Sequence, residues 1–183
     1  MGIAGSLGVV LVLYSSLAVQ DETAETEVGA ALVAAIAADD IVAYSQCWTS
    51  ARWSFATAKE YGVELPAAEA EKMRDYIQLR NKSIAESFQK IQSLINEQEI
   101  DRQMIRLKTC EARAVRERKA PNGTFRQAGG FSIEISAEAE EWQLEIDDAV
   151  MDRGIWHFTD SPRYLRDLRA GETILSFPIP TIR

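Results

Sequence analysis

The sequence predicts an α+β domain in which helices come first and antiparallel strands follow. Apolar residues recur at helical spacing up to about residue 97, and from residue 101 they alternate with polar residues in short runs separated by turn signals. The chain has 183 residues, the length of a single domain. Its 46% hydrophobic and 26% charged residues are typical of globular proteins.

The first twenty residues, MGIAGSLGVVLVLYSSLAVQ, carry no charged side chain. Their apolar centre from Gly8 to Leu13 has the length of a signal-peptide core, and Ser16 to Ala18 are the small residues that a signal peptidase accepts. We therefore expect residues 1–18 to be a signal peptide and the protein to be exported, to the periplasm or the extracellular space. A membrane anchor over residues 1–20 is the alternative, because twenty uncharged residues can just span a bilayer.

Three helices are expected between an acidic linker, residues 19–25, and residue 97. The first has one apolar face, made by Val28, Leu32, Ala35 and Ile36. The second follows Asp39 and Asp40 as one continuous apolar stripe from Ile41 to Ala58, and it ends at Gly62 because glycine fits the left-handed position after a helix.

Pro66 opens the longest expected helix, because proline fits the first turn, where its missing N–H needs no partner. An apolar stripe then continues to about residue 97. At about 1.5 Å per residue this helix is about 45 Å long. We expect it to be the central packing helix of the domain.

Antiparallel strands are expected after residue 101. Residues 103–117 alternate imperfectly, which indicates a bulge near Lys108 and Thr109. The turn signal Pro121-Asn122-Gly123 leads into a strand through Phe125. Two further strands are indicated by apolar residues of one parity, and these are Phe131, Ile133 and Ile135, then Trp142, Leu144 and Ile146.

The C-terminal region is predicted to leave the sheet. The turn Asp152-Arg153-Gly154 leads into a last strand from Ile155 to Phe158. Ser161 and Pro162 then favour a short helix carrying Tyr164, Leu165 and Leu168, and TILSFPIPTIR reads as an extended tail. The predicted domain covers residues 26–160, and residues 161–183 are the short helix and tail.

The break AADDIVAYSQCW and the closing hairpin carry a family resemblance. The hairpin has the form D-x-hydrophobic followed by G-x-W-x-F, from Asp148, Val150, Gly154, Trp156 and Phe158. With the helical first half, these features resemble the NTF2-like or cystatin-like superfamily over residues 26–160. The resemblance implies a curved sheet that wraps a helix and can form a cone-shaped pocket.

Charge is divided between two segments of the second half. Residues 101–130 carry eight basic side chains against three acids, and residues 131–152 carry eight acids and no base. If these segments are neighbouring strands, they form cross-strand ion pairs. A basic strip for phosphate or acidic lipid is the alternative. Nucleic acid is not an expected partner, because the chain has a net charge of −8.

Asp148 and His157 are the candidate catalytic residues. The resemblance implies this pair, because NTF2-like folds sometimes house an Asp and a His for isomerase or dehydratase chemistry, and a histidine near its ordinary pKa can be a general base. The alternative is a hairpin with a solvated acidic face. His157 is the only histidine, and no Cys or His cluster has metal spacing, so no metal and no cofactor are expected.

The tryptophans are candidate ligand-binding residues. Trp48, Trp142 and Trp156 sit where they can line a pocket, with core packing as the alternative. Cys47 and Cys110 are the only cysteines, so one disulfide is the most the chain can form, and two separately buried thiols are the alternative.

These observations favour an exported, non-enzymatic domain that binds a small apolar or amphipathic ligand, or a protein partner, on the concave side of its sheet. An isomerase or dehydratase that uses Asp148 and His157 is the first alternative. A structural or assembly protein, with the long helix or the tail pairing two copies as a homodimer, is the second. The only membrane contact expected is through an uncleaved N-terminal segment.

Overall fold

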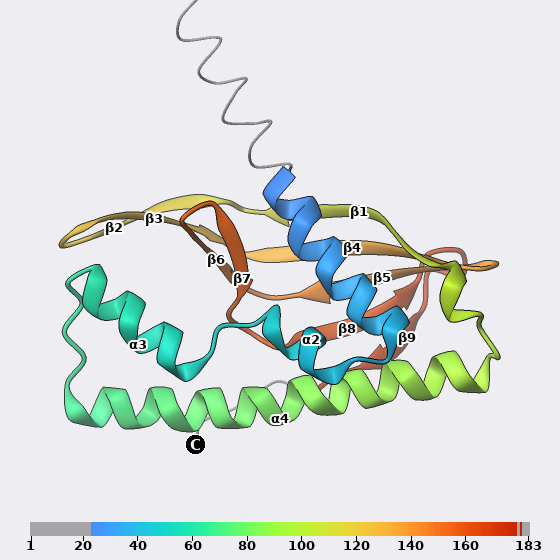
Figure 1. The fold of residues 1–183 in the computed structure, drawn as a ribbon, viewed down its shortest axis with the longest axis horizontal. Coiled ribbons are helices and arrows are strands. Elements are labelled where there is room, and N and C mark those ends of the chain that lie inside the picture. Colours follow the sequence, from blue (N-terminus) through green and yellow to red (C-terminus); the bar gives the residue numbers. More distant parts are fainter. Residues whose placement is uncertain (1–22, 179, 181–183) are drawn as a thin grey trace, which may run out of the picture.

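The structure is a computed structural model that describes residues 23–178 and residue 180. Helices cover two antiparallel sheets, and the longest helix runs the full length of the molecule (Figure 1). This arrangement confirms the predicted α+β class. The predicted signal peptide, residues 1–18, and residues 19–22 of the acidic linker lie outside the described residues.

The described part of the first helix covers residues 23–38, and it is followed by α2 (Ile41–Gln46) and α3 (Ala51–Glu60). The Asp40 side chain caps α2 by accepting from two backbone N–H groups, at 2.9 and 3.0 Å. One continuous second helix was therefore the wrong prediction. The chain breaks because Ser50 caps a new helix, and because Trp48 forms an isolated β-bridge with Phe158.

The long helix α4 (Ala67–Glu97) begins after Pro66, as predicted. Its buried residues begin at Ile77, so the first third of the helix extends beyond the main core. Its buried apolar side chains in the second half are Ile84, Phe88, Ile91, Leu94 and Ile95.

In the part of the chain that the structure describes, nine strands form two antiparallel sheets. A five-stranded sheet has the order β1-β4-β5-β8-β9, and a four-stranded sheet has the order β2-β3-β6-β7. A short 3-10 helix, η1 (Arg102–Met104), precedes β1. The strands are β1 (Ile105–Arg113), β2 (Arg116–Ala120), β3 (Gly123–Ala128), β4 (Gly130–Ala137), β5 (Glu140–Ile146), β6 (Ala149–Asp152), β7 (Ile155–Phe158), β8 (Pro162–Asp167) and β9 (Thr173–Ser176).

The strand pattern of the sequence is confirmed where alternation was clear. The register of β1 against β4 shifts between Leu107 and Thr109, so the predicted bulge is present. The predicted turns form the β2–β3 and β6–β7 hairpins. The two predicted apolar rows are almost completely buried, and they are Phe131, Ile133 and Ile135, then Trp142, Leu144 and Ile146.

The short helix predicted after Ser161 is wrong. Residues 162–167 form β8, which pairs with β5, and β9 pairs with β8 at the edge of the sheet. Burial explains the difference. Leu165 is fully buried opposite Leu144 in the sheet, so it packs as a strand residue and not as part of the apolar face of a helix. The sheet thus extends through residue 176, beyond the predicted boundary at 160.

Ion pairs join the basic and acidic segments, but they reach across an intervening strand instead of joining neighbouring strands. Lys108 contacts Glu141 at 3.1 Å, and Arg113 contacts the buried carboxylate of Glu145. Both pairs link β1 to β5 across β4. Within residues 23–178, no helix is long and apolar enough to cross a membrane.

Candidate functional site

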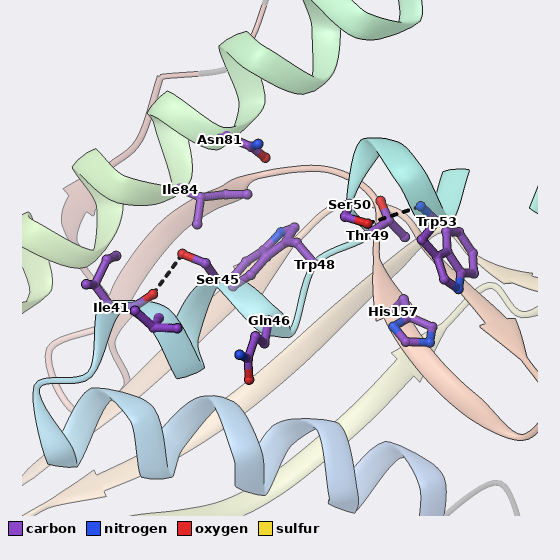
Figure 2. A pocket seen from close by; sticks show the side chains of 11 residues that line it. Ile41, Ser45, Gln46, Trp48, Thr49, Ser50, Trp53, Asn81, Ile84 and His157 are labelled. Carbon is purple, nitrogen blue, oxygen red and sulfur yellow. Dashed lines mark hydrogen bonds between the residues drawn. The ribbon is translucent and has the colours of Figure 1, made fainter. Parts of the chain in front are cut away.

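Two hollows adjoin the side chain of Trp53, which stands in the first turn of α3. The first is an open cleft of about 620 Å³ between α2, α4 and β7, which we call the α2 cleft (Figure 2). Its walls combine apolar and polar side chains, and they are Ile41, Val42, Ser45, Gln46, Trp48, Thr49, Ser50, Trp53, Asn81, Ile84 and His157. The α2 cleft is thus a surface hollow whose lining is mostly apolar with some polar groups.

The second hollow lies between α3 and the four-stranded sheet, and we call it the α3 cavity; like the first it is open to solvent, and Val63 on its wall is 41% exposed. Its volume is about 270 Å³. An apolar cavity of about 150 Å³ is known to hold benzene, so this space is large enough for one ring or a short alkyl chain. Its walls are almost entirely apolar, and they are lined by Trp53, Ser54, Thr57, Ala58, Tyr61, Val63, Met73, Phe125, Val150, Met151, Asp152 and Thr159.

The cavity exists because α3 does not pack closely on the sheet. None of its ten residues is fully buried. The residues that line the cavity from the middle of this helix are Ser54, Thr57 and Ala58, whose small side chains leave space above Val150 of β6. The large side chains that line the cavity beside this helix are Trp53 in its first turn and Tyr61 just after its last residue.

Contacts at both ends hold α3 above the sheet. At its start, the Trp53 ring lies 5.1 Å from the His157 ring, and at its end Tyr61 lies 5.4 Å from Phe125. Tyr61 follows Trp53 by eight positions, which at about 1.5 Å per residue is about 12 Å along the helix. Trp53 and Tyr61 therefore stand at opposite ends of the helical wall of the cavity.

Polar contacts strengthen the attachment at the end of α3. Arg153 donates to both carboxylate oxygens of Glu60, at 2.7 and 2.9 Å. The backbone N–H of Asn122 donates to the Tyr61 carbonyl at 3.1 Å. Gly62 has a φ of +71°, and a Cβ there would lie 2.8 Å from the Asn122 side chain, so only glycine fits this junction.

A buried arginine lies behind the hollows. Arg80 of α4 donates to the Thr49 hydroxyl at 2.8 Å, to the Thr49 carbonyl, and to the Thr159 carbonyl at 2.9 Å. Nearby, Tyr76 donates to the Asp160 carboxylate at 2.8 Å. Burial lowers the pKa of Arg80, and Tyr76 and Asp160 oppose that shift. This network ties α4 to the break before α3 and to the end of β7.

The candidate catalytic residues take different partners. His157 lines the α2 cleft and contacts Trp53, whereas the Asp148 carboxylate accepts from Gln127 at 2.8 Å. Asp148 lines neither hollow. Burial lowers the pKa of His157, and Asp152 opposes that shift. His157 is thus neutral at pH 7 and is placed as a packing partner of Trp53.

The three predicted ligand-binding tryptophans divide between cleft and core. Trp48 lines the α2 cleft but is 5% exposed, and its indole N–H donates to the Asp160 carbonyl at 2.6 Å. Trp142 and Trp156 are core residues, each 1% exposed. The fourth tryptophan, Trp53, borders both hollows.

The two cysteines are separate free thiols. Cys47 follows α2, and Cys110 in β1 packs against Gly29 of the first helix, so no disulfide joins them. Burial raises the pKa of each to about 12, so neither is a thiolate at neutral pH. Among the described residues no group of three or more His, Cys, Asp or Glu could hold a metal ion.

Sequence reasoning missed most of the α3 cavity. Besides Trp53, its aromatic residues are Tyr61, which follows the end of α3, and Phe125, which lies in a different sheet from Trp142. One signal was present: the inner face of α3 carries small residues at helical spacing, Ser54, Thr57 and Ala58. Small residues facing a sheet leave space.

Comparisons with protein family models, with curated proteins and with solved structures gave no match.

Proposed function

We propose that this protein is a non-enzymatic binding domain that holds a small apolar or amphipathic molecule in the α3 cavity. The observation that carries the proposal is the almost wholly apolar lining of a space of about 270 Å³ beneath a helix without a buried residue. Ligand sites are typically concave and apolar with a few polar groups, and their usual volumes begin near ~300 Å³.

Two further considerations support the same role. The cavity lies between a helix and a curved antiparallel sheet, which is where the NTF2-like resemblance leads one to expect a pocket. The uncharged residues 1–20 favour export, so the ligand would be one met outside the cytoplasm.

A cavity-filling variant tests the proposal. Ala58 is half-buried and lines the cavity, whereas Ala56 is exposed on the outer side of the same helix. Ala58→Phe should fill much of the space, and Ala56→Phe is the matched control. Calorimetric titration with toluene, a single apolar ring, should give a binding isotherm for the wild type and for Ala56→Phe and none for Ala58→Phe.

Two outcomes of this titration contradict the proposal. The first is equal binding by all three proteins, which would place the toluene elsewhere. The second is the absence of binding by the wild type. Circular dichroism of each variant verifies that Ala58→Phe has kept the wild-type helix and strand content.

A further inference from the structure

The α2 cleft is a second hollow, separate from the α3 cavity. Its volume of about 620 Å³ lies within the range of about 300–1,000 Å³ that is typical of small-molecule sites. Among the described residues, Trp53 is the one side chain that lines both hollows. Because the rest of the two linings differ, a ligand of the cleft can differ in chemistry from a ligand of the cavity.

Apolar side chains are exposed on the α2 side of the cleft. Ile41 and Val42 line it and are 38% and 63% exposed. They are the first two residues of α2, and the Asp40 side chain fixes the start of this helix by accepting from the backbone N–H of Val42. Ile84 lines the cleft from α4 (Figure 2). A hydrocarbon group bound here would remove Ile41 and Val42 from water, which is favourable.

Hydrogen-bond donors line another part of the cleft. Arg80 donates to the Thr49 hydroxyl oxygen at 2.8 Å and to the Asn81 side-chain oxygen at 3.3 Å. The Ser50 hydroxyl oxygen accepts from the backbone N–H of Trp53 at 3.1 Å. Because these three oxygens already accept, the hydroxyl hydrogens of Thr49 and Ser50 and the amide N–H groups of Asn81 remain as donors. An oxygen atom of a ligand is the complementary group.

The donors and the exposed apolar residues lie apart. In Figure 2, Thr49 and Ser50 lie on the opposite side of Trp48 from Ile41. A molecule that fills the cleft therefore meets hydrogen-bond donors at one end and hydrocarbon at the other. This division matches an amphipathic ligand.

The cleft offers no ionic partner to a charged ligand. Among the described residues that line it there is no Asp, Glu, Lys or Arg, and His157 is neutral at pH 7. Arg80 lies behind Thr49, is 1% exposed, and has its charge partly offset by that of Asp160. A charged head group would lose its water without gaining an ion pair, which costs free energy. The lining therefore suits an uncharged head group.

We propose that the α2 cleft is a second binding site, which takes an uncharged amphipathic molecule with a hydroxyl-bearing head group. Oxygens of the head group accept from Thr49, Ser50 and Asn81, and the hydrocarbon part covers Ile41 and Val42. This inference is independent of the proposed function, because it concerns a different hollow with a different lining.

Three probes with one hydrocarbon chain and different head groups test the inference: hexyl glucoside, hexyl sulfate and hexylammonium, titrated into the protein by calorimetry at pH 7. The wild type should bind hexyl glucoside most tightly. In Asn81→Leu, hexyl glucoside should bind about threefold to tenfold more weakly, the effect of one lost hydrogen bond. Gln78→Leu is the matched control, because Gln78 is exposed on the same helix and lines neither hollow. It should leave the affinity unchanged.

Two filling variants separate the cleft from the cavity. Ser45 is exposed and lines the cleft, so Ser45→Phe should abolish the binding of hexyl glucoside and leave the binding of toluene unchanged. Ala58→Phe should have the reverse effects. Absence of hexyl glucoside binding, equal binding of the three probes, or binding that is lost in Ala58→Phe and kept in Ser45→Phe would overturn the inference. The toluene titration tests the α3 cavity separately.

Discussion

The two ends of this molecule are built from the same elements, a helix laid over an antiparallel sheet, yet one end is solid and the other is hollow. Over the five-stranded sheet, the second half of α4 buries large side chains such as Phe88 and Ile91. Over the four-stranded sheet, α3 buries none of its residues completely. The difference lies in the side chains on the inner face of each helix: they are large and apolar in α4, whereas those in the middle of α3 are small.

This contrast assigns stability to the closely packed end of the molecule and ligand binding to the hollow end. A protein of this size has a small net free energy of unfolding, so its stability depends on the close-packed region. A helix without a fully buried residue contributes less to that stability and can keep a space open beneath it. The solid end positions the strands from which the hollow end is built.

The largest expected effect compares two phenylalanines. Phe131 is fully buried and contacts the Trp156 and Phe158 rings, whereas Phe125 is half-buried beside Tyr61. Phe131→Ala should lower the free energy of unfolding by about 3–5 kcal/mol because it opens a cavity in packed core. Phe125→Ala should lower it by only about 1 kcal/mol. Urea denaturation of both variants measures the difference, and equal losses would remove the contrast between the two ends.

Replacing a small side chain by a large one should also destabilise the packed core more than the hollow end. Ala35 in the first helix is 2% exposed, so Ala35→Phe overpacks the core and should cost about 1–3 kcal/mol. Ala58→Phe enters open space and should change the free energy of unfolding by no more than about 0.5 kcal/mol. Thermal and urea unfolding of the two variants test this ranking. A loss above about 2 kcal/mol in Ala58→Phe would mean that the space beneath α3 is already full.

A pH dependence should come from the contact between α3 and β7. Burial lowers the pKa of His157 in the folded protein, so the unfolded chain takes up this proton first as the pH falls. The wild type should lose stability below its unfolded pKa of about 6.5, until the folded histidine is protonated as well. His157→Gln should lack this part of the pH profile. Parallel profiles for the two proteins between pH 7 and pH 5 would contradict the assignment.

The smallest expected effect concerns the ion pair at the end of α3. Glu60 and Arg153 have side chains 56% and 73% exposed, so Glu60→Gln should change the free energy of unfolding by less than about 1 kcal/mol. Its local effect should be larger, with faster amide hydrogen exchange in α3 and unchanged exchange in α4. Uniformly faster exchange in both helices would show that α3 is not attached independently.

The buried strands of the closely packed end could be predicted from the sequence, whereas the cavity of the hollow end could not. Clean alternation, as at Phe131 and Ile133, predicts a buried strand because one parity must face the core. The helix predicted after Ser161 failed because Tyr164, Leu165 and Leu168 have helical spacing, whereas the pairing of β8 with β5 decides the structure. Local patterns do not record such long-range pairing.

The candidate site shows the same limit. The closing hairpin was correctly recognised, but the partners of its side chains come from distant elements: Trp53 for His157, and Gln127 for Asp148. Trp142 and Trp156 were expected at a pocket and lie in the core, because strand parity turns both toward packed side chains. A cavity is a property of how elements pack, and composition alone does not reveal it.

The central claim is that the space between α3 and the four-stranded sheet is an apolar cavity, and a crystal structure of the protein under xenon pressure tests it most directly. Xenon binds in apolar cavities. The account predicts a xenon atom between Thr57 of α3 and Val150 of β6, and its disappearance in Ala58→Phe. Side chains filling that space in the wild type, with no xenon bound, would contradict it.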